Sequence, residues 1–506
     1  MKIFTTSEIK AIERYTMETE HITSLDLIER AAEAIASEIM SRWRPGRPIT
    51  IFAGQGNNGA DALTVGSLLI AQGYTPRIIL FNINGNRLSP ECKACRDAII
   101  STGYTYFTEV INKFQMPELT RHDVVIDGLF GTGLSAPLEG GFVSLVGAIN
   151  ESKATVVSID IPSGLSGDWN PRTLRRNVIR AHLTLAIQFP HLCFFLPDYA
   201  DLVGEWKIID IGLSADAVAS TPSQFYLVEQ DDVRRILRRR RNFSSKADYG
   251  SALLYAGTYG MMGAAVMAAR GALRSGVGKL TVSSPMCGYQ VLQSAVPEAL
   301  YQFINNDATI NEMRPRHLYD SIAIGPGIGT ADVTVKALED FLISATKPVI
   351  LDADALNCMA LKPSMLSSLP VLSILTPHEG EFDRLFGQQP SGEARLRKAL
   401  EMARYYNIII VLKGHYTAIV RPDEKIYFNS SGSPALATAG SGDVLTGILV
   451  SLMAQNYPPE HATLMAVFIH GVAGEMAAET HGEYGVVASD IADNVGRAIK
   501  EMLAGK

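Results

Sequence analysis

The sequence predicts an α/β protein made of two doubly wound domains, each with an open, largely parallel sheet. Short apolar runs recur along all 506 residues, and they are continuous rather than alternating, as in strands buried on both faces. The spacers between these runs are long enough for the crossover helices that parallel strands require. One arginine-rich segment interrupts the pattern and divides it into two halves.

In the first half, two helical segments precede a series of β-rich runs. The predicted strands are ITIFAG (49–54), RIILF (77–81), DVVID (123–127), TVVSID (155–160), LTLAI (183–187) and WKIID (206–210). Helices between them would give repeated βαβ units. These units predict a parallel sheet for the first domain.

The division between the halves lies near residues 226–248, where the run from Arg234 to Arg241 breaks the apolar pattern. It is interpreted as a solvated linker helix; the alternative is a basic rim that meets nucleotide phosphates. We therefore expect domains at 1–220 and 246–506, joined by a linker at 221–245.

The second half repeats the pattern with other strands. The candidates are 251–257, 279–284, 321–325, 348–352, 371–375 and 407–414, with a hairpin at 417–420 and 425–428. A long helix is expected from near Gly442 to about Gln455. This arrangement predicts a second open α/β sheet.

Composition narrows the functional classes. With 47% hydrophobic and 19% charged residues, the chain is typical of globular proteins. A net charge of −7 disfavours nucleic acid as a main partner, and no apolar run reaches the roughly 18 residues of a membrane helix. Five cysteines predict free thiols and a cytoplasmic location, with Cys92 and Cys95 on one helix face rather than in a metal or redox site.

Candidate site residues of the first half follow its strands, since ligands of open α/β sheets bind beyond the strand carboxyl ends. A glycine-rich turn at 54–61 carries two asparagines, and Asp127 and Asp160 end later strands. With oxygens from Asn58 and Ser163, a hard cation could be held by oxygen ligands alone. The alternative is that each aspartate caps the next helix.

The motifs GNNGAD, DGLFGTG and DIPSG, in this order, resemble the NAD(P)H-hydrate epimerase family, over most of residues 1–215. The resemblance implies a Rossmann-like sheet, a potassium ion on Asn58, Asp127 and Ser163, and Asp160 as acid/base facing the damaged ring. It also implies a set of residues along the hydrate: Asn57, Asn58, Gly59, Ala60, Asp61, Gly131, Thr132, Gly133, Leu134, Ser135, Ala136, Pro137 and Asp160.

Three residues depart from the epimerase pattern. Ala60 and Ala62 stand where the family usually has glycines, and His191 stands where it tends to have lysine. A methyl group at 60 would crowd a phosphate, unless the position is already helical, where alanine is favourable. A first domain that only binds is therefore an alternative to an epimerase.

In the second half, TAGSGD (438–443) precedes a predicted helix. Backbone amides at a helix N-terminus can hold a transferring phosphoryl group, and Asp443 could take a proton from an attacking hydroxyl. The alternative is a glycine-rich turn with an aspartate in the first helical turn. The segments GPGIG (325–329), DADAL (352–356), TPHEGE (376–381) and KG (413–414) follow other strands and converge on the same edge.

The motifs KADYG, GMMGAA, GPGIG, DADAL, LTPHEGE, VLKG, ATAGSGDVLTG and HGVAGE resemble the ADP/ATP-dependent NAD(P)H-hydrate dehydratase family, which has a ribokinase-like fold, almost throughout 242–506. Ala247 is a mild departure. The resemblance implies that Asp443 is catalytic. The residues implied for the hydrate are Ala264, Gly327, Gly329, His378 and Asp443, and those for the nucleotide are Lys413, Gly414, His415, Tyr416, Thr417 and Gly442.

Together the two resemblances imply repair of hydrated NADH and NADPH. One domain would interconvert the R and S hydrates, and the other would dehydrate the S hydrate with ADP, or ATP, giving AMP and phosphate from ADP. Potassium and magnesium are the expected ions, and a homo-oligomer is expected. The alternative for the second domain is a ribokinase-like kinase of a small alcohol.

Overall fold

The computed structural model describes residues 1–83, 85, 87–134, 136–315 and 317–504. The chain forms two compact units, Lys2–Gln224 and Phe225–Lys506, and Met1 belongs with the second. No helix within the described ranges has both the length and the apolar character needed to cross a membrane.

The Lys2–Gln224 unit contains a parallel sheet in the order β4-β3-β2-β5-β6-β7-β8. The strands of this sheet are β2 (Ile49–Ala53), β3 (Arg77–Phe81), β4 (Phe107–Val110), β5 (Val124–Gly128), β6 (Thr155–Ile159), β7 (Leu183–Ile187) and β8 (Glu205–Ile209), and the short strand β1 (Lys2–Ile3) is not part of it. The helices of the unit are α1 (Thr6–Glu20), α2 (Ser24–Arg42), α3 (Asn57–Ala71), α4 (Pro90–Ser101), α5 (Gly141–Glu151), α6 (Ala200–Val203) and α7 (Ala215–Ser220).

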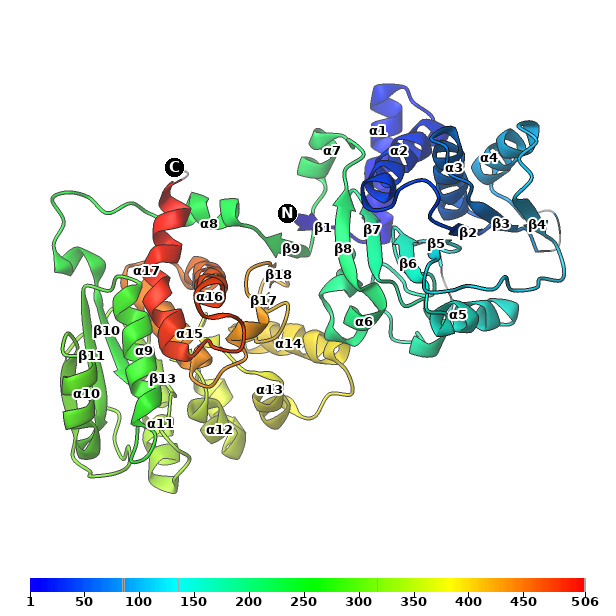
Figure 1. Cartoon of the computed structure of the whole chain (residues 1–506). Helices are drawn as coiled ribbons and strands as arrows, with labels where there is room; N and C mark the ends of the chain where they lie inside the picture. The colour runs from blue at the N-terminus through cyan, green and yellow to red at the C-terminus, as the bar shows by residue number, and fades with distance from the viewer. Residues whose placement is uncertain (84, 86, 135, 316, 505–506) are drawn as a thin grey trace. The chain divides into compact units, whose positions relative to one another are not determined.

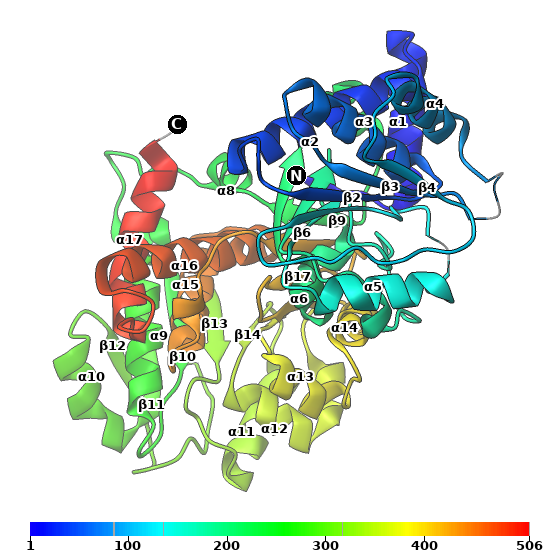
Figure 2. The same cartoon turned by 45° about the vertical axis from the view of Figure 1, so that its right-hand side comes forward.

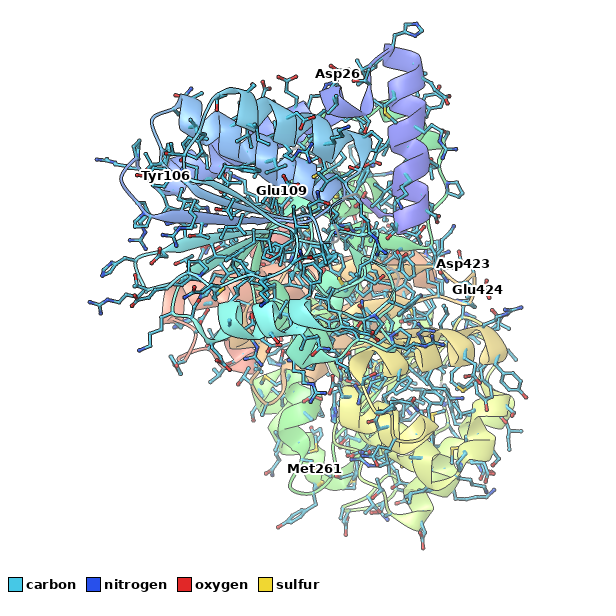
Figure 3. All side chains as sticks on the ribbon, turned by 90° about the vertical axis from the view of Figure 1, so that its right-hand side faces the viewer. Asp26, Tyr106, Glu109, Met261, Asp423 and Glu424 are labelled. Carbon is cyan, nitrogen blue, oxygen red and sulfur yellow. The ribbon has the colours of Figure 1, made fainter. Side chains whose placement is uncertain are left out.

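Helices cover both faces of this sheet, as the doubly wound prediction requires (Figure 1). On one face, α2 and α3 bury residues such as Ile35 and Leu63 against the strands. On the other, α5 buries Val146 and Ile149. Local sequence sets the helix starts, because Thr23 caps α2 and its backbone N–H bonds the side chain of Asp26, which Figure 3 labels at the start of that helix.

The Phe225–Lys506 unit has the strand order β9-β18-β17-β16-β15-β14-β13-β10-β11-β12. All of these pairings are parallel except β16–β17 and β17–β18. The strands are β9 (Phe225–Val228), β10 (Ser251–Tyr255), β11 (Lys279–Pro285), β12 (Leu300–Ile304), β13 (Ser321–Ile324), β14 (Ile350–Leu351), β15 (Ile374–Leu375), β16 (Ile409–Leu412), β17 (Ala418–Val420) and β18 (Ile426–Asn429). The predicted hairpin is confirmed, and Asp423 and Glu424 lie in its turn (Figure 3).

The helices of this unit also lie on two faces. They are α8 (Gln230–Ile236), α9 (Met262–Arg274), α10 (Tyr289–Ala295), α11 (Asp332–Ser344), α12 (Asp354–Leu361), α13 (Glu379–Phe386), α14 (Gly392–Tyr406), α15 (Ser441–Ala454), α16 (Pro459–His481) and α17 (Ala488–Ala504). Helices α9, α15, α16 and α17 pack together over one face (Figure 2). The ring of Phe341 on α11 contacts Tyr255 of β10 from the other face.

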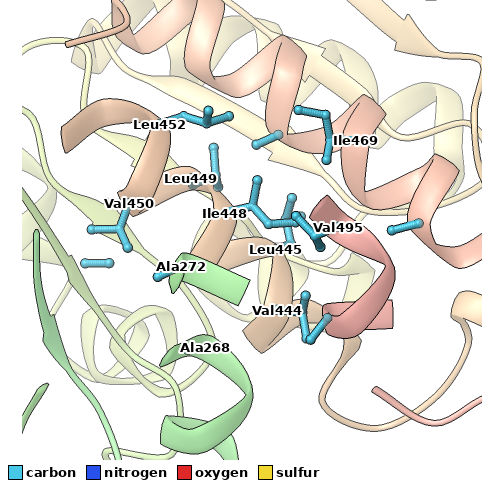
Figure 4. Close-up of a cluster of buried hydrophobic side chains, with 14 of the residues drawn as sticks. Ala268, Ala272, Val444, Leu445, Ile448, Leu449, Val450, Leu452, Ile469 and Val495 are labelled. Carbon is cyan, nitrogen blue, oxygen red and sulfur yellow. The ribbon is translucent and has the colours of Figure 1, made fainter. Parts of the chain in front are cut away.

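Helices α9 and α15 pack closely against each other (Figure 4). A Cβ atom at Gly447 would lie 2.0 Å from the carbonyl oxygen of Ala268, and one at Gly271 would lie 2.5 Å from that of Val444. Glycine therefore lets the two helix backbones touch. Around this crossing, Ala272 and Ile448 are fully buried.

The α/β class and the predicted strand series are confirmed, as is the long helix, which is α15. The sequence pattern missed β4 and β12. Within the segment predicted as a linker, residues 225–228 form β9, which pairs with β18, and residues 230–236 form α8.

Candidate active sites

In the Lys2–Gln224 unit a cavity of about 660 Å³ lies at the carboxyl ends of the strands. It is bounded by α1, by the turn into α3, and by the segments that follow β5, β6 and β7. The residues lining it are Thr6, Ile9, Lys10, Glu13, Gln55, Gly56, Asn57, Asn58, Asp61, Leu129, Phe130, Gly131, Thr132, Gly133, Leu134, Ala136, Pro137, Leu138, Glu139, Phe142, Asp160, Ile187 and His191. Most of the residues predicted for the hydrate are therefore in one place, and Ser135 is outside the described residues.

The predicted residues Gly59 and Ala60 do not line this cavity. A Cβ atom at Gly59 would lie 1.9 Å from the carbonyl oxygen of Gly54, so this glycine lets α3 begin directly against the turn after β2. Ala60 is fully buried in the core, as is Ala62. The alanine at position 60 is therefore helical and directed into the core rather than into the cavity.

The three predicted cation ligands converge on one loop. Asp127 is fully buried and accepts hydrogen bonds from Ser158 Oγ at 2.8 Å and from Ser163 Oγ at 2.5 Å. Ser163 Oγ also accepts from the backbone N–H of Phe130 at 2.9 Å. Both polar atoms of the Asn58 side chain are buried without a hydrogen-bond partner. Burial raises the pKa of Asp127, opposed by its bonds to Ser163 and Ser158.

Asp160 directly follows β6 in an uncommon backbone conformation, with φ of 65°. Its Oδ1 lies 2.9 Å from His191 Nε2 and also accepts from the backbone N–H of Ile187 at 3.3 Å. The His191 side chain is only 2% exposed, and its Nδ1 has no hydrogen-bond partner. A residue that sequence analysis treated as a departure thus holds the predicted acid/base group.

Three more carboxyl groups face this cavity, those of Asp61, Glu13 and Glu139. Asp61, on α3, was predicted, whereas Glu13, on α1, was missed. Burial, reinforced by the charge of Asp160, raises the pKa of Glu13 to about 7. Burial, and then the charges of Asp160 and Glu13, raise the pKa of Asp61 well above its ordinary value. Only the tertiary structure reveals Glu13, because its position on an amphipathic helix is typical of an ordinary surface glutamate.

In the Phe225–Lys506 unit, Asp443 lies in the first turn of α15. Gly440 precedes the helix with φ of 88°, a conformation that favours glycine. The first backbone amides of a helix have no partner within it, so they can hold an anion. Burial, with the charge of Asp352 added, raises the pKa of Asp443 to about 7.

Lys413, predicted for the nucleotide, directly follows β16 and lies between two carboxylates. Its Nζ lies 2.9 Å from Asp352 Oδ1 and 3.8 Å from Glu381 Oε2. Thr446 Oγ1 on α15 donates to the other oxygen of Asp352 at 2.7 Å. A Cβ atom at Gly442 would lie 3.2 Å from Lys413 Nζ, so this cation lies against the start of α15.

Three of the residues predicted for the hydrate in this unit, Ala264, Gly327 and Gly329, lie around the start of α9. A Cβ atom at Gly327 would lie 2.7 Å from the carbonyl oxygen of Met261 and 3.2 Å from Ala264 Cβ. Met261 is labelled in Figure 3, immediately before α9. The backbone N–H of Gly329 donates to Asp354 Oδ2 at 2.9 Å, which fixes the loop against α12.

Other predicted residues of this unit have clear local roles. His378 caps α13, since its Nδ1 accepts from the backbone N–H of Gly380 at 3.0 Å. Thr417 Oγ1 donates to the carbonyl oxygen of Gly414 at 2.9 Å, and the rings of His415 and Tyr416 stack. Within the described part of the chain, no group of three or more His, Cys, Asp or Glu side chains could hold a metal ion.

In comparisons with known proteins, a different family model matches each half of the chain. A family model described as NAD(P)H-hydrate dehydratase matches residues 252–497, and one described as YjeF-related protein N-terminus matches residues 24–193. The bifunctional NAD(P)H-hydrate repair enzyme Nnr of Thermofilum pendens is 32% identical over 99% of this chain and 97% of that protein. The enzyme of the same name from Moorella thermoacetica is 31% identical over 97% of this chain and 96% of that protein.

A solved structure of the ADP/ATP-dependent NAD(P)H-hydrate dehydratase from Bacillus subtilis is also similar. It is 34% identical, with a TM-score of 0.49, and the match covers 55% of this chain and 98% of that one.

Proposed function

The chain belongs to the family of bifunctional NAD(P)H-hydrate repair enzymes, and we propose a separate reaction for each of its two units. The Lys2–Gln224 unit interconverts the epimers of the hydrate. The Phe225–Lys506 unit dehydrates the S epimer at the expense of an adenine nucleotide. The observation that carries this proposal is that each unit has its own partly buried aspartate at its own sheet edge, Asp160 in one and Asp443 in the other.

The first site suits a large anionic ligand that carries a ring. Its cavity of about 660 Å³ is in the size range of small-molecule sites, and the turn into α3 offers helix N-terminal amides to a phosphate. Asp160, oriented by His191, takes or gives a proton at the damaged ring. The residues along the hydrate are those of the predicted set that line the cavity.

A potassium ion fits the donors around Phe130. Asn58 has a buried amide oxygen without a partner, Ser163 supplies a hydroxyl, and Asp127 is the single carboxylate. One negative charge with neutral oxygens suits a weakly charged cation, because Mg²⁺ is more usually held by carboxylates, waters and phosphates. When bound, the ion supplies positive charge beside the loop that faces the dinucleotide.

In the second unit the dehydration begins with a phosphoryl transfer. Hydroxide is a poor leaving group, so the hydroxyl oxygen of the hydrate first attacks the terminal phosphorus of the nucleotide while Asp443 takes its proton. Amides at the start of α15 and the ammonium group of Lys413 stabilise the transferring group. Phosphate then leaves, a proton is lost from the neighbouring ring carbon, and the dihydropyridine is restored.

ADP is the proposed phosphoryl donor, with ATP as the alternative, and magnesium accompanies the nucleotide phosphates. The residues that follow β16, from Lys413 to Thr417, together with Gly442, form the proposed nucleotide site. A homo-oligomeric assembly and a cytoplasmic location remain predictions.

Two single substitutions test whether each unit carries out its own reaction. Asp160→Asn should stop interconversion of the hydrate epimers and leave dehydration of the S epimer intact, whereas Asp443→Asn should do the reverse. Chromatography separates the epimers, and the returning dihydropyridine absorbance reports dehydration. Equal loss of both reactions in a folded variant would indicate one shared site, and phosphorylation without dehydration would indicate a small-alcohol kinase.

A further inference from the structure

Helix α1 is fixed against the segments that carry Asp160 and His191. The backbone N–H of Thr6, the first residue of α1, donates to Asp168 Oδ1 at 3.0 Å. Just before the helix, the ring of Phe4 packs edge-on against Phe189, with centroids 4.8 Å apart. These contacts hold Glu13, two turns farther along α1, at the wall of the same cavity.

Several buried polar atoms of this cavity have no partner. They are Thr6 Oγ1, His191 Nδ1 and both polar atoms of the Asn58 amide, and all three residues line the cavity. Buried polar groups are nearly always hydrogen-bonded. Apart from the Asn58 amide oxygen, which is assigned to the cation, these unpartnered atoms on α1, α3 and the segment after β7 point to a polar ligand that contacts α1 as well as the predicted loops.

Epimerisation of the hydrate requires acid–base chemistry on both faces of its ring. The hydroxyl-bearing carbon is bonded to the ring nitrogen. An acid protonates the hydroxyl, the C–O bond breaks, water leaves with the bonding pair, and the nitrogen lone pair forms a C=N bond. Water then adds to the opposite face and gives a proton to a base, while the C=N pair returns to nitrogen. One carboxyl group cannot serve both faces.

We propose that Glu13 is the second acid–base group of the first site, acting on one face of the ring while Asp160, held by His191, acts on the other. This inference rests on the proposed epimerase function. In one direction Glu13 gives a proton to the departing hydroxyl and Asp160 takes one from the incoming water. Solvent water then takes the proton from Asp160 and returns one to Glu13, which restores the starting protonation states before the next turnover. In the other direction their roles exchange.

The surroundings of Glu13 suit this role. Its pKa of about 7, raised by burial and by the charge of Asp160, leaves both protonation states populated near neutral pH, which is what a reversible proton carrier needs. The titratable groups that face the cavity from the packed elements are Lys10 on α1, Asp61 on α3, Glu139 before α5, Asp160 after β6 and His191 after β7.

The test compares Glu13→Gln with the matched control Glu18→Gln, an exposed glutamate on the same helix. Interconversion of the hydrate epimers is followed by chromatography from pH 5 to pH 9 without nucleotide, after subtraction of the rate without protein. Calorimetric titration with the hydrate mixture measures binding, and dehydration of the S epimer with ADP reports the other unit.

Glu13→Gln should lower the interconversion rate roughly 10²–10⁴-fold, remove the change in rate near pH 7, and keep binding and dehydration near the levels of Glu18→Gln. A rate and pH profile like those of the wild type would overturn the inference, and so would a loss of rate matched by an equal loss of binding. If Glu13→Gln does not fold, a wild-type profile that is flat through pH 7 overturns it. A wild-type protein that does not interconvert the epimers would instead refute the epimerase function.

Discussion

Replacing Asp443 by asparagine should stabilise the Phe225–Lys506 unit and slow its reaction. Burial and the charge of Asp352 raise the pKa of Asp443 from 3.8 to about 7. This rise of about three pKa units, at 1.36 kcal/mol each, corresponds to ~4 kcal/mol that opposes folding when the group is charged. Asparagine has nearly the same shape and needs no charge in this place.

The sign of the effect follows from the direction of the shift. The folded-state pKa lies above the unfolded value. The free-energy cost of keeping Asp443 charged in the folded unit is therefore absent below about pH 4 and complete only above about pH 7. Asp443→Asn should therefore be more stable than the wild type at pH 8, by an amount on the order of 4 kcal/mol, and about equally stable at pH 4. Dehydration should fall roughly 10²–10⁴-fold.

Hydrogen exchange of the α15 amides, compared between variant and wild type at the same pH, measures the opening free energy of this unit alone. Asp332→Asn is the matched control, because Asp332 is an exposed aspartate in the first turn of α11. A stability difference that is the same at pH 4 and pH 8 would refute the reasoning about charge. Dehydration at the wild-type rate would remove Asp443 from the mechanism.

Three further substitutions test other parts of the structure. Gly59→Ala should destabilise the Lys2–Gln224 unit by roughly 1–3 kcal/mol or more, because its methyl group meets the carbonyl of Gly54; urea unfolding measures this, and an unchanged midpoint would contradict it. Lys413→Met should destabilise the Phe225–Lys506 unit by about 3–5 kcal/mol, because it leaves the charge of Asp352 without its cation. Hydrogen exchange should show a smaller loss of stability in the double variant with Asp352→Asn than in Lys413→Met alone. Asn58→Leu should raise the potassium concentration for half-maximal epimerisation at least roughly tenfold, and an unchanged potassium dependence, with sodium as balancing salt, would argue against the ion.

The strands and the loops after them were predictable because their signals are local. Apolar runs such as 155–159 and the glycines after them need no tertiary information. The edge strand β4 was not predictable, since it reads Phe-Thr-Glu-Val and is only partly buried. Strand β9 was hidden because it lies at the start of the arginine-rich segment, where the apolar pattern ends.

The residues around the proposed acid/base group of the first unit were only partly predictable, for a different reason. Asp160 follows a strand in a glycine-rich segment, so its position alone indicates a site. Glu13 lies 147 residues earlier on a helix, and only packing brings the two together. The sequence analysis treated His191 as a departure from the epimerase pattern. Its contact with Asp160 depends on the fold, so residue type alone does not predict it.

The glycine crossing of α9 and α15 has a consequence for motion. Helix α9 starts at the loop of Gly327 and α15 carries Asp443, and the two backbones touch where Gly271 and Gly447 lack side chains. Asp443 and the Gly327 loop are therefore attached to two helices whose backbones are in close contact, and we expect them to move together. We expect any closure over the proposed nucleotide site to come from elements outside this helix pair, such as the β17–β18 hairpin, without a change in the spacing between Asp443 and the Gly327 loop.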